Sequence, residues 1–234
     1  EQMWQFAQSC KAIRDCCDDL RFEENTNLPI IAGNVSFYNQ SGSSAIPSSP
    51  MIGSFGKNRN INNAIKNSFQ SNASTVFVLG AKNQQLGGSV VADILKVKNN
   101  DVCHFSNKDY SALLNNIIDL GAENLILSSR VVTRGGLAVS LCKMSFHNSI
   151  GITANVGEKT FDIDLFNENL SIIIEVDNKN VAEAQKTLET NSIPFDIIGA
   201  TSSKETIMIN NKVNLSIKEA KNVWDTSLRK KLLS

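Results

Sequence analysis

The sequence has no excess of charge of either sign. Its 234 residues contain 23 lysines and arginines and 23 aspartates and glutamates, so its formal net charge is zero. Such a chain does not attract a nucleic-acid backbone or an anionic membrane over long distances, and we expect neither as a partner. A phosphate-bearing small ligand would have to be held by local donors.

Long apolar runs and a secretory leader are also missing. No stretch approaches the roughly eighteen apolar residues of a membrane-spanning helix, and the first residues lack the charged start, apolar centre and cleavage site of a signal peptide. We therefore expect a cytoplasmic protein. A hydrophobic content of 41% is still enough for a genuine core, which favours a globular chain of one large or two modest domains.

Cysteine and histidine are scarce. The five cysteines are an odd number without a repeated Cys-x-x-Cys pattern, and the histidines are His104 and His147. These numbers give little support to a zinc site or a disulfide framework. The glycine turn at residues 83–89 lacks the lysine of a Walker loop, so it is a weak phosphate-loop signal.

The chain begins with a pattern typical of an amphipathic helix. Six residues recur at spacings of three and four, which places them on one helical face: Met3, Phe6, Cys10, Ile13, Cys17 and Leu20. We expect Cys10 and Cys17 to fill a core, with Cys16 on an adjoining face. A reactive cysteine pair is the alternative, but no cationic partner accompanies it. The pattern starts without a cap or initiator methionine, so we expect a piece of a longer protein.

Residues 28–39, LPIIAGNVSFYN, are interpreted as a strand that leads into a ligand loop. A short apolar run ended by glycine and asparagine is typical of a half-buried or buried strand. Gly33 lets the backbone approach a ligand closely, and the Asn34 amide and Ser36 hydroxyl could contact a phosphate, a ribose or the hydration shell of a metal. An ordinary Gly-Asn turn is the alternative, and residue chemistry alone favours it.

The rest of the chain alternates between short strands and helices. A strand at residues 50–56 is expected to pair with the first one, and a domain junction is expected near residues 71–74. Further strands are predicted at residues 75–80, 124–127, 150–156, 171–176, 195–199 and 207–209, and helices at 109–120, 181–190 and from Ser216, where a capping box begins. The irregular order favours an α+β fold with a mixed sheet over a doubly wound one.

Residues 130–142 are predicted to run from a strand into a helix through Gly135 and Gly136. Backbone amides at such a helix start could bind an anion. Close packing of the two glycines, with Cys142 buried, is the more ordinary interpretation.

Taken in order, these motifs resemble the synthetase part of phosphoribosylformylglycinamidine synthase, the formylglycinamide ribonucleotide amidotransferase of purine biosynthesis, over its C-terminal third. The resemblance is carried by blocks spread over nearly the whole chain: WQF and AIRD within residues 4–15, PIIAGNVSFYN at 29–39, IP and PMIG within 46–53, LGGS at 86–89, GGLA at 135–138 and the helix around Trp224. The block at residues 29–39, with the others in family order, makes the resemblance specific.

The resemblance implies a fold similar to that of aminoimidazole ribonucleotide synthetase, in which a barrel-forming domain precedes an outer α+β domain with a mixed sheet and flanking helices. Residues 1–72 would be the C-terminal portion of the second barrel-forming domain. Residues 73–234 would be the whole second outer domain.

The family's reaction is an ATP-dependent carbon–nitrogen ligation. The formamide oxygen of formylglycinamide ribonucleotide is phosphorylated, and ammonia then displaces the phosphate to give the amidine; the moving phosphoryl group requires Mg²⁺ and positioned donors. By the Gly-Asn-x-Ser match, Gly33 would contact ATP, Asn34 would ligate Mg²⁺ through its amide oxygen, and Ser36 would contact the substrate. The family's catalytic histidine lies in earlier domains, so neither His104 nor His147 inherits its role.

The chain departs from the family where relatives usually read SxHDVSDGGL. Residues 128–137 read SSRVVTRGGL, so Arg130, Val131 and Arg134 replace a histidine and two aspartates. A cation would lose its ligands there; the arginines could bind phosphate instead, or the change could be drift in a noncatalytic half. Glu168 is kept without its usual Gly-Glu-Ser-Gln surroundings, so the sequence does not support a second nucleotide site in the outer domain.

Three interpretations remain open. The chain is expected to be part of the ligase, inactive alone, and to need the upstream synthetase domains, a glutaminase subunit or domain that supplies ammonia, and, in small synthetases, a bridging subunit. Alternatively, the replacements at Arg130 and Arg134 would fit a degenerate, noncatalytic homologue that acts as a scaffold or interaction module. The third interpretation is a kinase-like member of the same superfold with another small substrate.

Overall fold

The computed structural model describes residues 1–23, 26–34, 40–46, 49–58, 60–80, 85–97, 101–102, 106–157 and 161–233. The chain forms two compact units: unit 1 is Glu1–Arg59 with Ser106–Ser111, and unit 2 is Asn60–Phe105 with Ala112–Ser234. This division lies near residue 60, ahead of the predicted boundary between residues 72 and 73. The assignment of residues 1–72 and 73–234 to two domain types stays a prediction.

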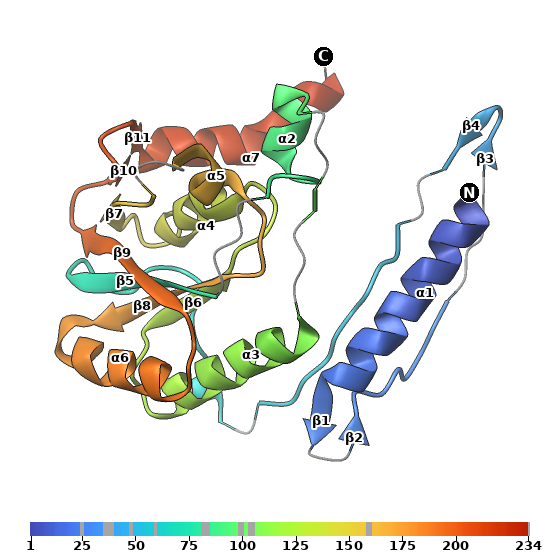
Figure 1. Cartoon of the computed structure of the whole chain (residues 1–234). Coiled ribbons are helices and arrows are strands. Elements are labelled where there is room, and N and C mark those ends of the chain that lie inside the picture. Colours follow the sequence, from blue (N-terminus) through green and yellow to red (C-terminus); the bar gives the residue numbers. More distant parts are fainter. Residues whose placement is uncertain are drawn as a thin grey trace. The chain divides into compact units, whose positions relative to one another are not determined.

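Unit 1 is one long helix with short hairpins (Figure 1). The predicted N-terminal helix is confirmed as α1, Gln2–Asp19. Strand β1 (Arg21–Glu23) pairs antiparallel with β2 (Thr26–Asn27), and β3 (Gln40–Ser41) pairs in the same way with β4 (Ser44–Ala45). None of the unit 1 residues whose exposure is described is buried, a set that leaves out residues 21–23. Unit 1 therefore has no core of its own within its described part.

Three expectations for unit 1 are wrong. Residues 28–34 and 49–58 form no strand, so the predicted pairing between them is absent from the described residues. Cys10 is exposed instead of filling a core. A strand needs a neighbouring strand to pair with, and residues 28–34 and 49–58 have none in the described part of unit 1. The apolar face of α1 needs a second layer to cover it, and the described part of unit 1 supplies none.

Unit 2 is built on a seven-stranded sheet in the order β11-β10-β7-β9-β5-β8-β6. Its strands are β5 (Ser74–Leu79), β6 (Ser128–Val131), β7 (Gly151–Ala154), β8 (Ile172–Asp177), β9 (Phe195–Ser202), β10 (Thr206–Ile209) and β11 (Val213–Ser216). β10 and β7 are parallel, and the other neighbours in this sheet are antiparallel. The predicted α+β fold with a mixed sheet is confirmed.

Helices cover both faces of this sheet (Figure 1). On one side lie α4 (Gly136–Ser145), α5 (Phe161–Phe166) and α7 (Ile217–Leu233), and on the other lie α6 (Val181–Thr190) and the unit 2 part of α3 (Asn107–Ala122). The shorter elements are α2 (Val90–Leu95) and the 3-10 turns η1 (Ile61–Asn63) and η2 (Asn178–Asn180). In the described part of the chain, no helix is both long and apolar enough to cross a membrane.

The larger core of unit 2 lies between the sheet and α4. Side chains that are fully buried there include Leu141, Met144, Ile152 and Ile207. Strand residues alternate between faces, so Ile173 of β8 joins this core while its neighbours Ile172 and Ile174 face the α6 side. The sheet is therefore covered on both faces, and the polar groups on its buried strands need internal partners.

Candidate functional site

The loop at residues 33–36 is described only in its first half. Gly33 and Asn34 are exposed and lie in a segment without helix or strand, whereas Ser36 lies outside the described residues. A Cβ placed on Gly33 would meet no heavy atom within 4 Å, so a ligand could approach the backbone there. Within the described part of the chain, no three His, Cys, Asp or Glu side chains gather as a metal site. Asn34 itself could give a magnesium ion one amide oxygen.

The glycine turn before α4 binds an anion that belongs to the chain itself. Oε1 of Glu168 accepts a hydrogen bond of 2.8 Å from the backbone N–H of Gly135 and one of 2.9 Å from that of Val90. These amides stand at the starts of α4 and α2, where helix dipoles favour a negative group. The predicted anion site at this helix start is thus filled by the Glu168 carboxylate.

The same turn requires glycine for its packing. Gly136 has φ +68°, and a Cβ there would lie 2.8 Å from the carbonyl oxygen of Leu165 and 2.7 Å from that of Asn167. The predicted close packing is confirmed. Cys142, on the helix that follows, is partly buried, and burial raises the pKa of its thiol to about 11, so at neutral pH it is a protonated packing residue and not a nucleophile.

A buried carboxylate at Glu175 forms a second polar centre, which the sequence interpretation missed. Glu175 is 0% exposed, and its two oxygens accept hydrogen bonds from the backbone N–H groups of Gln70 (2.8 Å) and Ser71 (2.9 Å) and from the hydroxyls of Ser74 (2.8 Å) and Ser128 (2.7 Å). A single acidic residue inside the apolar strand IIIEV was the available signal. The carboxylate ties residues 70–71 to three strands of the sheet.

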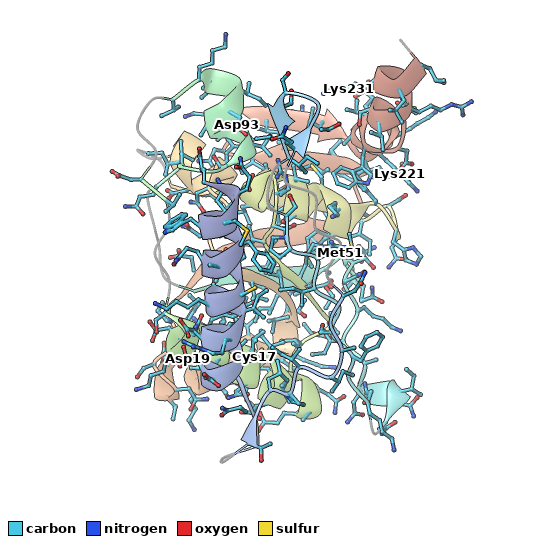
Figure 2. All side chains as sticks on the ribbon, turned by 90° about the vertical axis from the view of Figure 1, so that its right-hand side faces the viewer. Cys17, Asp19, Met51, Asp93, Lys221 and Lys231 are labelled. Atoms are coloured by element: carbon cyan, nitrogen blue, oxygen red, sulfur yellow. The ribbon has the colours of Figure 1, made fainter. Side chains whose placement is uncertain are left out.

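A basic pocket lies on unit 2 where the segment before β5 meets β6, the end of α4 and α7. It has a volume of about 490 Å³, and its lining includes the cations Lys66, Arg130, Lys143 and Lys221 together with Trp224. Lys221 projects from α7 (Figure 2). The pocket takes in one of the two arginines that replace acidic or histidine residues of the family pattern.

Two of the pocket's cations are held in place. Nε of Arg130 donates a 3.0 Å hydrogen bond to the carbonyl oxygen of Asn67, and burial lowers the pKa of the guanidinium. Nζ of Lys143 lies 4.7 Å from the centre of the Trp224 ring, a cation–π contact. The arrangement can attract an anion but contains no nucleophile with a partnered base.

Histidines and the remaining cysteines form no catalytic arrangement among the described residues. His147 lines the basic pocket, and His104 lies outside the described residues. Cys17 and Asp19 both lie near the C-terminal end of α1 (Figure 2). Burial and then the neighbouring Cys17 raise the pKa of Cys16, so the Cys16 thiol is not activated toward thiolate chemistry.

Solved structures first define the class of fold. The PurLQS complex and PurL complexed with FGAR, both from Thermotoga maritima, each match 68% of this chain with a TM-score of 0.54, at 8% and 10% sequence identity. The matched part covers 27% and 30% of those chains. The predicted fold class, α+β of the aminoimidazole ribonucleotide synthetase-like type, is confirmed.

Sequence relatives then add a similarity to one protein. Phosphoribosylformylglycinamidine synthase subunit PurL is 31% identical over 92% of this chain in Campylobacter lari, 31% over 99% in Picrophilus torridus and 27% over 97% in Thermobifida fusca. No family model matches the chain. The chain is therefore related to PurL over nearly its whole length, as its motifs predicted, and it spans 29%, 30% and 29% of the length of these three relatives.

Proposed function

We propose that this chain contributes to an ATP-dependent carbon–nitrogen ligase that converts formylglycinamide ribonucleotide to formylglycinamidine ribonucleotide. The observation that supports this is the similarity to PurL over 92% to 99% of the chain. Because the chain spans less than a third of those relatives, the activity is proposed for a protein that also contains the other synthetase regions. Alone, the chain is predicted to be inactive.

The residues proposed to act here are those of the loop at 33–36. Gly33 would contact ATP, Asn34 would give one neutral oxygen to Mg²⁺, and Ser36 would contact the substrate. The open surroundings of Gly33 are compatible with a close approach of a nucleotide. PurL of T. maritima has been solved in complex with ATP, which supports ATP as the nucleotide. When bound, Mg²⁺ would neutralise charge on the transferred phosphoryl group.

The proposed reaction needs ammonia, for which we propose a glutaminase subunit or domain as the source. A small bridging subunit is a further proposed partner. The T. maritima relative is known as a PurLQS complex, which supports the proposal that additional subunits assemble with the synthetase. We propose the cytoplasm as the place of this reaction.

Asn34→Ala in the complete synthetase tests the proposal. Loss of a ligand to a charged group should raise the barrier of kcat/KM at limiting Mg²⁺ by about one to three kcal/mol, and excess Mg²⁺ should recover part of the loss. Asn62→Ala is the matched control, since Asn62 is an exposed asparagine of η1 outside the loop. Unchanged kinetics of Asn34→Ala at limiting Mg²⁺ would disprove the role of Asn34.

A noncatalytic scaffold is the second candidate. It is favoured by the loss of acidic residues at Val131 and Arg134 and by Glu168, whose Oε1 is already bonded to two backbone amides. This candidate predicts that the protein containing all synthetase regions assembles with its partners but does not hydrolyse ATP when substrate and ammonia are supplied. Measurable amidine formation would exclude it.

A further inference from the structure

The basic pocket has the size of a small-molecule site. Its volume of about 490 Å³ falls within the range of about 300 to 1,000 Å³ that is usual for such sites. Every residue that forms it belongs to unit 2, whereas the loop at residues 33–36 belongs to unit 1, so the two share no residue. An inference about it therefore does not depend on the proposed ligase activity.

Charge is concentrated in this pocket although the chain as a whole is neutral. Among the described residues that line it, four are lysine or arginine and one, Asp225, is acidic. The formal net charge of the whole sequence is zero, so this excess is local. A concave surface lined by charge of one sign raises the local concentration of ions of the opposite sign. The pocket is therefore suited to an anion.

The cations come from four separate parts of unit 2. Lys66 precedes β5, Arg130 belongs to β6, Lys143 to α4 and Lys221 to α7. The hydrogen bond from Arg130 to Asn67 uses Nε, so it leaves the two terminal nitrogens to other acceptors. Converging donors of this kind match the several oxygens of a phosphate group, to which charge-assisted hydrogen bonds are strong.

Trp224 adds an apolar surface that could contact the organic part of a ligand. Its side chain is 51% exposed, and it lines the same pocket while Lys143 lies over its ring. An exposed indole offers an apolar, polarisable surface to the organic part of a ligand. The pocket thus combines positions for a phosphate and for an attached organic group.

We propose that the basic pocket binds a small phosphate ester, with the phosphate among Arg130, Lys143 and Lys221 and the organic part against Trp224. The shared chemistry is a phosphomonoester or pyrophosphate group, whether it comes from a sugar phosphate or a nucleotide. The pocket's limited volume favours a small ligand over a nucleic-acid strand.

Tryptophan fluorescence provides a direct test. The sequence has two tryptophans, so in a Trp4→Phe background Trp224 is the single reporter. Ribose 5-phosphate, ADP, inorganic pyrophosphate and uncharged ribose are titrated into the full chain. A saturable change is expected with both esters and with pyrophosphate, weakening as salt is added, and none with ribose. Comparison of ribose 5-phosphate with ADP distinguishes the sugar-phosphate and nucleotide sources.

Substitutions assign the binding to the pocket. Lys221→Gln should weaken binding of the ester by about three- to tenfold, the loss of one charge-assisted contact. Lys218→Gln removes an exposed lysine of the same helix outside the pocket and should leave binding unchanged. Lys66→Gln, in the segment before β5, is a second pocket variant, and unfolding midpoints confirm that each variant is folded.

The proposal is overturned by any of three results. The first is that no phosphate compound gives a saturable change. The second is that Lys218→Gln weakens ester binding as much as the two pocket variants do. The third is that a single-stranded RNA oligomer binds more tightly than either ester. Since the full chain is used without any assay of ligation, failure here would leave the proposed ligase function standing, and failure of the Asn34 test would leave this proposal standing.

Discussion

Glu175 accepts hydrogen bonds at both carboxylate oxygens from groups that are distant in the sequence. The backbone N–H groups come from residues 70 and 71, more than 100 positions away, and the hydroxyls from Ser74 and Ser128. A buried acidic side chain is tolerated only when it is hydrogen-bonded in this way. The surrounding apolar residues could have been predicted from sequence, but the donors could not, because they meet only in the folded sheet.

Glu175→Gln is expected to destabilise unit 2. A carboxamide has one acceptor oxygen and an NH₂ group that faces existing donors, so the free energy of unfolding should fall by about 1 to 3 kcal/mol. Urea denaturation followed by circular dichroism measures this. Glu123→Gln, at an exposed glutamate after α3, is the control and should change stability little. Equal stability of the two variants would contradict the role assigned to Glu175.

Cys142 should make stability depend on pH in the alkaline range. Burial raises the pKa of its thiol from an ordinary value of 9.0 to about 11. The unfolded chain therefore loses this proton first as pH rises, so the contribution of Cys142 to stability is present below pH 9 and is lost between pH 9 and 11, by about 2 to 3 kcal/mol. Urea midpoints across this range should fall more steeply in the native protein than in Cys142→Ala. Parallel curves would contradict the assignment.

Among the elements, α2 and α4 share one capping group. Glu168 lies 78 residues from Val90 and 33 from Gly135, yet its Oε1 bonds both amides. The sequence predicted the glycine turn and the start of α4, because glycine punctuation is a local signal. The sequence could not predict which anion binds at the turn. That depends on how α5 and the residues after it place Glu168 next to the turn.

Glu168→Ala and Glu168→Gln separate the charge from the hydrogen bonds. Alanine removes both bonds and should lower the unfolding free energy by about 1 to 2 kcal/mol. Glutamine keeps an acceptor oxygen at Oε1, so it should lose only the interaction of the charge with the two helix starts and cost less. Urea unfolding gives the energies, and amide hydrogen exchange at Val90 and Gly135 locates them. If neither amide exchanged faster in the alanine variant than in the native protein, the shared cap would be refuted.

Local pattern determined which elements could be predicted. The helix at 181–190 was predicted with its observed bounds, and in the last helix the N–H of Glu219 donates to Ser216 Oγ at 3.1 Å, as the capping box requires. The strand predicted at 124–127 is instead β6 at Ser128–Val131, and β11 was missed. β6 is fixed by its pairing with β8, which lies far along the chain, so its exact bounds are not a local signal. β11 instead forms a hairpin with the preceding strand β10, and its partly polar sequence hid it.

At the scale of the whole molecule, the two units differ in how much they bury. Unit 2 has a covered sheet, whereas the described part of unit 1 has no buried residue and exposes Ile31 (79%) and Phe55 (91%) among other large apolar side chains. The sequence could supply the apolar pattern of both units. It could not reveal that, among the residues whose placement is described, the second layer is found in unit 2.

Hydrogen exchange should therefore proceed on two timescales in the isolated chain. Backbone amides of α1 are protected only by local helical hydrogen bonds and should exchange far faster than those of β5 and β8, whose opening requires disruption of the core. Mass spectrometry of peptides from each unit measures this. Strands β5 and β8 serve as the internal reference, and protection of α1 as strong as theirs would contradict the prediction.

The contacts of residues 66–73 with the sheet affect where this chain can be joined to a relative in a hybrid protein. Phe69 is fully buried, and its backbone N–H donates a hydrogen bond to the carbonyl oxygen of Met144. The carbonyl oxygen of Lys66 accepts a hydrogen bond from the backbone N–H of Ser129. A chimaera joined at Ser74 would therefore replace a segment that the sheet already holds at several points. A crossover ahead of residue 60 would transfer sheet and segment together, so hybrid proteins made with relatives should tolerate a junction there better than one at the first strand.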